Sequence, residues 1–233
     1  MIIDFHTHIL PRMDDGSESS DQSLEMLHEM KRQGVDVVVA SSHFYGYREG
    51  PESFLERRKA CYDRLCQKID ENCPRILLGA EVAFHSGLTK TEGLERFCIE
   101  GTNVLMVEMP FSPWSVMEEN FIAQLAVQKG FQVVLVHPER YEAFRSMNKE
   151  AKAILKLPVM LQHNAEAFTH LSGRRQWLEM LESGKSHLLG SDSHNMKNRA
   201  PNLAEGRKVI EKKLGKDILD RIDTQGAKLL GLE

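Results

Sequence analysis

The chain has 233 residues and a formal net charge of −4, so it lacks the broad basic surface that nucleic-acid binding requires. A hydrophobic content of 41%, a charged content of 27% and a mean hydropathy of −0.38 exclude the disordered and fibrous classes of protein. The longest apolar runs, such as VVLV at 133–136, are too short to cross a bilayer, and the N-terminus does not resemble a secretory signal. We therefore expect a single domain over residues 1–233 in the cytoplasm, with no membrane insertion and no nucleic-acid partner.

Seven short β-branched or aliphatic runs predict buried strands. In chain order they are MIIDFH at 1–6, VDVVVASS at 35–42, RILLGAEV at 75–82, NVLMVEM at 103–109, FQVVLVH at 131–137, PVMLQHN at 158–164 and SHLLGSDSH at 186–194.

Four segments between these runs have the apolar spacing of amphipathic helices. The first has apolar side chains from 24 to 30, and we expect Ser20 or Asp21 to be its N-cap and Gly34 to end it. The other three helices have apolar stripes at 55–69, 121–126 and 177–181. The polar segments at 44–53 and 110–120 predict longer loops.

About seven strand–helix units without a Pro- or Ser-rich linker predict an α/β fold, and specifically a closed or nearly closed (β/α) barrel. An open, doubly wound parallel sheet is the competing architecture. In a barrel, the loops that follow the strands surround one bowl. Residues that end different strands are therefore expected to lie together.

Side chains able to bind a cation end six of the seven predicted strands. Because residues i and i+2 of a strand point the same way, the pair His6 and His8 aims two imidazoles at one point. Glu81 and Glu108 interrupt apolar runs, where a carboxylate without a charged partner is costly. The candidate metal ligands are His6, His8, His43, Glu81, Glu108, His137, Asp192 and His194.

This set of ligands contains imidazoles and carboxylates but no thiolate, which favours manganese, iron, zinc or magnesium over a soft metal. Eight ligands exceed what a single tetrahedral or octahedral ion requires. We therefore expect two or three divalent ions bridged by carboxylate, as in two-metal phosphate-transfer sites.

Two arginines each follow a candidate histidine ligand within a few residues. Arg140 lies three residues beyond His137, and Arg199 lies five residues beyond His194. A guanidinium binds phosphate through two parallel hydrogen bonds. Beside a metal centre, these two arginines predict an anionic, phosphorylated substrate.

The remaining histidines and the cysteines receive simpler interpretations. The segment LQHN leaves open whether Gln162 and Asn164, or instead His163, face the bowl. We expect ordinary reduced cysteines and no cysteine nucleophile, because none of the four belongs to a C-x-x-C pair. The histidines expected at the surface or in the core are His28, His85, His170 and His187.

The strand-end residues stand in motifs that resemble those of the PHP (polymerase and histidinol phosphatase) superfamily. The motifs extend from residue 2 to about 200 and are, in order, DFHTHILPRMDDG, SSHFY, GAEV, VEMPF, VHPERY and GSDSHN. Within that superfamily they are most similar to the bacterial protein-tyrosine phosphatases of capsule and exopolysaccharide loci, the CpsB/YwqE type.

The resemblance implies a distorted (β/α)7 TIM-like barrel and a metal cluster that usually holds manganese. It also implies hydrolysis, by metal-activated water, of phosphotyrosine on a bacterial tyrosine kinase that controls polysaccharide export. The eight candidates above would be the metal ligands, and one of Asp14 and Asp15 would be a further ligand, a choice that the sequence leaves open. Arg140 and Arg199 would hold the phosphoryl group.

Arg12, His163 and Glu166 depart from the family pattern, which more often has small or hydroxyl residues there. These departures leave substrate alternatives open: a small phosphomonoester such as histidinol phosphate, or a phosphodiester. A metal-stabilised binding module is the alternative outside the enzymes. A small substrate predicts a closed pocket, whereas a phosphotyrosine on a protein tail predicts an open groove. The conformation of the loops near Tyr45 and Trp114 would decide between these two shapes.

Overall fold

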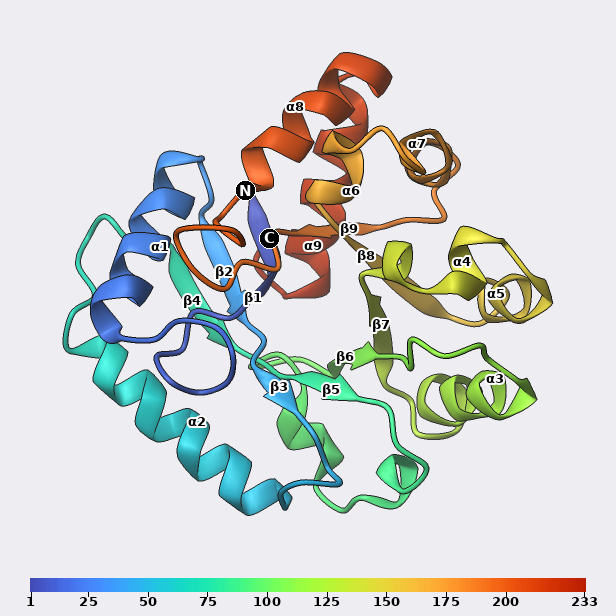
Figure 1. Ribbon diagram of the computed structural model, residues 1–233, viewed down its shortest axis with the longest axis horizontal. Coiled ribbons are helices and arrows are strands. Elements are labelled where there is room, and N and C mark those ends of the chain that lie inside the picture. The colour runs from blue at the N-terminus through green and yellow to red at the C-terminus, as the bar shows by residue number, and fades with distance from the viewer.

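The computed structural model describes residues 1–233 as parallel strands surrounded by helices (Figure 1). The strands form two sheets, ordered β1-β2-β4 and β3-β5-β6-β7-β8-β9, and all neighbouring strands run parallel. The strands are β1 Ile3–Thr7, β2 Val37–Ala40, β3 His43–Phe44, β4 Arg75–Leu78, β5 Glu81–Ala83, β6 Val104–Glu108, β7 Gln132–Val136, β8 Val159–Asn164 and β9 Leu188–Gly190.

The first and last strands meet and bring the two sheets into one distorted barrel. Thr7 forms an isolated parallel bridge with Ser193, and the backbone N–H of His8 donates to the carbonyl of Ser193 at 2.9 Å. The N–H of Asp192 donates to the carbonyl of His6 at 2.7 Å. The predicted barrel is confirmed, and the open doubly wound sheet is wrong.

Two predicted strand runs are cut short or interrupted. The run at 35–42 contains β2 alone, and β3 follows just beyond it, after Ser41 and Ser42; the run at 75–82 divides into β4 and β5 at Gly79 and Ala80. After each interruption the strand resumes in the second sheet, where His43 pairs with Glu81. The breaks therefore bring two candidate ligands into register.

The helices form the outer layer around the strands (Figure 1). Among the shorter elements, a single π-helical turn at Gln124–Gln128 extends α3. None of the helices combines the length and the apolarity needed to cross a membrane. The helices are α1 Ser20–Arg32, α2 Pro51–Cys66, α3 Val116–Ala123, α4 Glu142–Arg145, α5 Lys149–Ile154, α6 Glu166–Thr169, α7 Arg174–Glu182, α8 Leu203–Leu214 and α9 Lys216–Leu229.

The sequence-based helix boundaries need three corrections. The N-cap of α1 is Ser19, whose Oγ accepts from the N–H of Gln22 at 3.2 Å, and not Ser20 or Asp21. The segments 44–53 and 110–120 are not loops throughout, because α2 begins at Pro51 and α3 begins at Val116 behind a capping box formed by Ser115 and Glu118. The short helices α4, α5 and α6 and the longer helices α8 and α9 were not predicted at all.

The inward-facing side chains of the strands change from apolar at the barrel floor to polar at the C-terminal rim. Ile3 and Phe5 of β1 pack in one small buried cluster with Val104 and Met106 of β6, and the end of α9 covers this cluster. The next residue on the same side of β6 is Glu108, at the C-terminal end of the strand. A larger apolar cluster fills the space between the strands and the helices. The four cysteines are free, as expected.

Helix α8 approaches the barrel through a glycine. A Cβ added at Gly206 would lie 2.6 Å from the carbonyl oxygen of Ala165 and 2.8 Å from its Cα. Ala165 directly follows β8, and its own N–H donates to the carbonyl of Gly190 at 2.8 Å. The backbone on the far side of the contact is therefore held in place and cannot easily give way.

We predict that Gly206→Ala destabilises the protein. Helix propensity alone predicts a gain of about 1 kcal/mol for this change, whereas crowding against fixed backbone predicts a loss of about 1–3 kcal/mol. Urea denaturation measures the free energy of unfolding, and Lys208→Ala, at an exposed position of the same helix, is the control. A more stable Gly206→Ala variant would show that the two segments separate without cost.

Candidate metal centre and anion-binding site

Glu81 lies at the middle of the cluster that the strand ends form. Its Oε2 lies 2.9 Å from His43 Nδ1, 3.2 Å from His6 Nε2 and 3.4 Å from His8 Nε2. Its Oε1 lies 2.7 Å from His137 Nε2. The side chain is only 1% exposed. One buried carboxylate thus contacts four imidazoles from the ends of three strands, β1, β3 and β7.

Asp192 is the second buried carboxylate of the cluster. Its Oδ1 lies 3.4 Å from His8 Nε2 and 3.6 Å from His6 Nε2. Glu108 lies on the other side, with its Oε1 3.6 Å from His137 Nε2. The structure therefore brings these predicted ligands together at one end of the barrel.

The other oxygen of Asp192 faces both candidate arginines. Its Oδ2 accepts from Arg199 Nη2 at 2.8 Å and pairs with the guanidinium of Arg140. The side-chain amide of Asn164 donates to the same oxygen at 3.0 Å. A single carboxylate thus lies between the imidazole cluster and two guanidinium groups.

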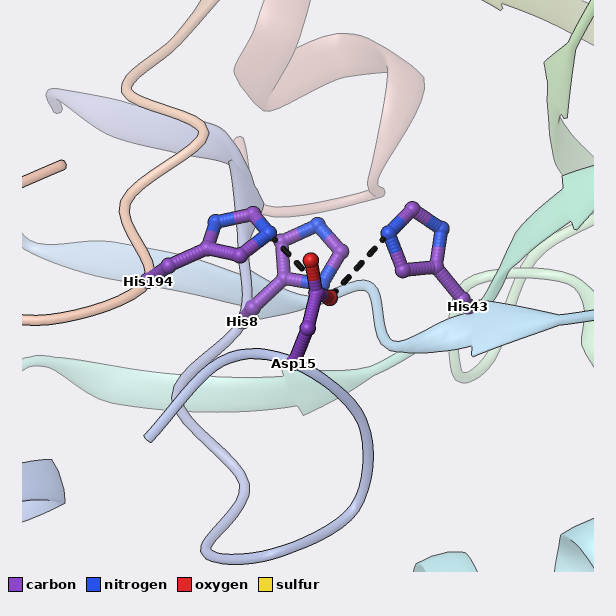
Figure 2. A group of neighbouring side chains, drawn as sticks. All are labelled: His8, Asp15, His43 and His194. Carbon is purple, nitrogen blue, oxygen red and sulfur yellow. Dashed lines mark ion pairs between the residues drawn. The ribbon is translucent and has the colours of Figure 1, made fainter. Parts of the chain in front are cut away.

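The loop after β1 supplies an aspartate to the cluster. Figure 2 shows Asp15 between His43 and His194, and its Oδ1 lies 3.4 Å from the Nε2 of each. Asp14 lies behind His8 instead, with its Oδ2 2.8 Å from His8 Nδ1. This geometry favours Asp15 as the further ligand and gives Asp14 the task of orienting His8.

Three of the imidazoles are oriented from behind in the way that metal-binding histidines are. Gln162 Oε1 lies 2.9 Å from His6 Nδ1, and the backbone carbonyl of Asp192 lies 2.9 Å from His194 Nδ1. With Asp14 behind His8, these partners leave the Nε2 atoms of all three rings directed at the cluster.

The ligand atoms fall into three overlapping groups, each compact enough for one ion. His8, His43 and Glu81 each belong to two groups, and of these Glu81, whose carboxylate has two oxygens, is the residue that would bridge neighbouring ions. The groups are His8, Asp15, His43 and His194; His6, His8 and Glu81; and His43, Glu81 and Glu108.

Two further observations indicate that these residues fit divalent ions. His43 Nδ1 and His194 Nε2 are buried and make no well-directed hydrogen bond, although each faces a carboxylate oxygen, at 2.9 Å and 3.4 Å, and buried polar atoms are nearly always satisfied. His137 and Asp192 adopt positive φ angles of 36° and 52°, which cost energy for residues other than glycine. Unsatisfied nitrogen atoms and strained backbone at the proposed ligands are expected where an ion completes the site.

The electrostatics of the cluster also require positive charge. Burial opposes ionisation of Glu81, but the surrounding imidazoles, His6 and His43 foremost, hold its pKa well below the usual range. Burial alone would lower the pKa of His43, whereas the charges of Glu81 and Asp15 raise it to about 10. Burial and the nearby charge of Glu81 raise the pKa of Glu108 to about 7. The buried carboxylates would therefore stabilise divalent cations bound among these imidazoles.

The question left open for β8 is resolved by its alternation. Gln162 and Asn164 face the bowl, while His163 points outward between the helices, where its Nδ1 lies 2.8 Å from Ser186 Oγ. The ring of His163 packs 5.2 Å from the ring of Trp177. His163 is therefore a core residue.

The other two departures from the family pattern lie nearer solvent. Arg12 is exposed, and its Nε donates to the carbonyl of Glu18 at 3.0 Å. Glu166 pairs with His170 at 2.7 Å, and both line a cavity of about 210 Å³ that also contains Arg140 and Arg199. Of the two, Glu166 is the one that borders the arginine pair.

Sequence reasoning missed the supporting role of Asp4. Its Oδ1 accepts from the N–H of Ser191 at 2.8 Å and from the N–H of His6 at 3.2 Å, so it ties β1 to the segment that carries Asp192. The signal was present in the motif DFHTH, where an acidic residue sits two positions before His6 inside an apolar strand.

Fold and site together define a (β/α) barrel with a histidine- and carboxylate-rich candidate metal centre beside an arginine pair. The family described as "Capsular polysaccharide synthesis, CpsB/CapC" matches residues 2–230, and the chain belongs to this family. The resemblance to the CpsB/YwqE type is thereby confirmed.

Individual relatives agree with the family. The chain is 28% identical over 236 residues to the tyrosine-protein phosphatase YwqE of Bacillus subtilis, covering 98% of this chain and 91% of YwqE. It is 27% identical to the tyrosine-protein phosphatase CpsB of Streptococcus agalactiae serotype V, covering 97% and 96% of the two chains.

Solved structures show the same fold. The crystal structures of YwqE from B. subtilis and CpsB from Streptococcus pneumoniae, described as unique metal-dependent tyrosine phosphatases, match with a TM-score of 0.83 and 25% identity over 100% of this chain and 95% of theirs. Dihydropyrimidinase from Brevibacillus agri shares the barrel alone, with a TM-score of 0.53 and 13% identity over 99% of this chain and 70% of that enzyme.

We predict that Glu81→Gln weakens metal binding by about tenfold or more, because it removes the charge shared by four imidazoles. Metal content after dialysis against manganese, measured by mass spectrometry, should fall. Chelation should lower the melting temperature of the wild type more than that of the variant. Glu95→Gln, at an exposed position, is the control. Unchanged metal content in Glu81→Gln would contradict the central place of this carboxylate.

We also predict an acid sensitivity that originates at His163. Burial lowers its pKa to about 3, while in the unfolded chain it is about 6.5, so only the unfolded state binds the proton between these values. The stabilisation that the buried, neutral His163 ring contributes is fully present above pH 6.5 and is lost as the pH falls below that value. Between pH 6.5 and 5 the loss is about 1.5 kcal/mol.

The measurement is urea denaturation of the metal-free protein at several pH values. His163→Gln keeps a polar partner for Ser186 and should lose less stability on acidification than the wild type. His170→Gln, which changes an exposed ring, should follow the wild type. Identical pH dependence in all three proteins would refute the assignment.

Proposed function

We propose that this chain is a metal-dependent protein-tyrosine phosphatase that hydrolyses phosphotyrosine on a bacterial tyrosine kinase of capsular or exopolysaccharide synthesis. The relatives named tyrosine-protein phosphatases and the matched family support the substrate class. The residues of this chain support the chemistry, as follows.

The observation that carries the proposal is the position of Asp192. Its Oδ1 faces the imidazoles of His6 and His8, and its Oδ2 faces Arg140 and Arg199. A phosphoryl group bound by the two guanidinium forks would therefore lie directly beside the metal cluster. A purely structural metal site has no use for two arginines in that position.

The roles of the residues follow from these contacts. Arg140 and Arg199 would orient the phosphoryl group and neutralise the charge on its oxygens in the transition state. Asn164 and Asp192 would hold the two guanidinium groups in place. Divalent ions, when bound, supply an activated water as nucleophile at neutral pH and further neutralise the phosphoryl charge.

The surroundings of the cluster favour a protein substrate over a small one. A cavity of about 440 Å³ borders Asp15, His43 and Tyr45 on one side. On the arginine side, the cavity of about 210 Å³ adjoins another of about 500 Å³, and both are lined by Arg140. Space on both sides of the cluster suits a peptide that passes across it.

The three overlapping ligand groups support two or three ions, and the absence of thiolate favours manganese, with iron, zinc or magnesium as alternatives. The substrate kinase consumes ATP, and we place the phosphatase with it in the cytoplasm. The ligand set that we propose is His6, His8, Asp15, His43, Glu81, Glu108, His137, Asp192 and His194.

We predict that Arg140→Ala lowers turnover of a phosphotyrosine peptide by about tenfold or more, because a positioned cation is lost from the transition state. Metal content, measured in parallel, should stay at the wild-type level, since the arginine is not a ligand.

Arg32→Ala is the matched control. Arg32 is an exposed arginine at the end of α1 and lines none of the cavities beside the cluster. Its removal should leave turnover near that of the wild type. Wild-type turnover in Arg140→Ala would show that this arginine does not hold the phosphoryl group.

A further inference from the structure

Two aromatic side chains lie against imidazoles of the cluster. The ring of Phe111 lies nearly parallel to that of His137, with 6.1 Å between the centroids and 13° between the planes. The ring of Tyr45 lies 5.2 Å from that of His43, at 23°. Neither ring was part of the expected metal centre.

These two rings lie at opposite oxygens of one carboxylate. His137, under Phe111, contacts Glu81 Oε1, and His43, under Tyr45, contacts Glu81 Oε2. The part of the cluster that contains Glu81 is thus flanked by an aromatic ring on each side.

The rings of Tyr45 and Phe111 differ in how much of their surface remains free for a ligand. The guanidinium carbon of Arg48 lies 4.7 Å from the centroid of the Tyr45 ring, so both Arg48 and His43 pack against this ring. Phe111 packs on His137 and, at a 45° tilt, on Tyr141, and it remains 55% exposed. Phe111 therefore has apolar surface left for a ligand.

The segment that carries Phe111 is held in place. Buried Trp114 donates from Nε1 to the carbonyl of Pro110 at 2.7 Å, which closes the loop around Phe111. Before the loop, the N–H of Met109 donates to the hydroxyl of buried Tyr141 at 2.9 Å. A single exposed apolar side chain is ordinary, but one fixed over a proposed metal ligand is placed to meet whatever binds there.

We propose that Phe111 determines specificity for the aromatic ring of the phosphoester, with Tyr45 and Arg48 as the fixed opposite wall. The inference rests on the proposed phosphatase function and adds how the leaving group is recognised. Phe111 would contact the phenyl ring while Arg140 and Arg199 hold the phosphoryl group. It is a binding residue and takes no part in bond breaking.

The test compares two non-hydrolysable anions of similar charge, phenylphosphonate and methylphosphonate, in titration calorimetry with the manganese-loaded protein. Loss of an aromatic contact should weaken phenylphosphonate binding to Phe111→Ala by about 3- to 10-fold. Methylphosphonate has no ring and should bind to the variant as it binds to the wild type.

Two further variants distinguish loss of the aromatic contact from a general disruption of the binding site. Phe111→Tyr keeps the ring and should restore phenylphosphonate affinity. Met117→Ala removes an equally exposed apolar side chain on α3 and should change neither ligand.

The outcomes distinguish the inference from the function on which it rests. Equal changes for both ligands in Phe111→Ala, or no change for either, would overturn the role of Phe111 and leave the phosphatase proposal standing. If the wild-type protein binds neither anion, the anion site itself is wrong, and both proposals are overturned.

Discussion

The structure depends on two buried carboxylates, Glu81 and Asp192, that are surrounded by imidazoles where water cannot reach. A buried carboxylate is costly unless cations are held against it. Four imidazoles contact Glu81, and two guanidinium groups and an amide contact one oxygen of Asp192. Positive charge held against these two carboxylates therefore offsets the cost of burying them at this end of the barrel.

The rest of the fold serves to bring these groups to one place. Breaks at Ser41–Ser42 and Gly79–Ala80 shift two strands into the second sheet, so that His43 and Glu81 become neighbours. Asp4 ties the first strand to the segment before Asp192. Below the cluster the same strands present only apolar side chains to the barrel floor, and α9 covers them. The fixed floor allows strained backbone at His137 and Asp192 to persist.

The sequence was sufficient for the barrel and the candidate ligands, because period-two alternation and strand-end polar residues are local signals. It could not choose between Asp14 and Asp15, since both lie in one loop and only the folded loop shows which reaches His43 and His194. It missed α8 and α9, whose packing depends on close contacts of Gly206 with Ala165 and of Gly226 with Phe5. It also gave no indication of Phe111, because nothing in a loop sequence tells which imidazole an aromatic ring will cover.

The measurement that tests this account most directly is phosphate release by the manganese-loaded protein from a phosphotyrosine peptide and, in parallel, from histidinol phosphate. The account predicts preference for the peptide and loss of activity on chelation. Preference for histidinol phosphate would keep the metal centre but contradict the protein substrate, and no release from either compound would contradict the phosphatase.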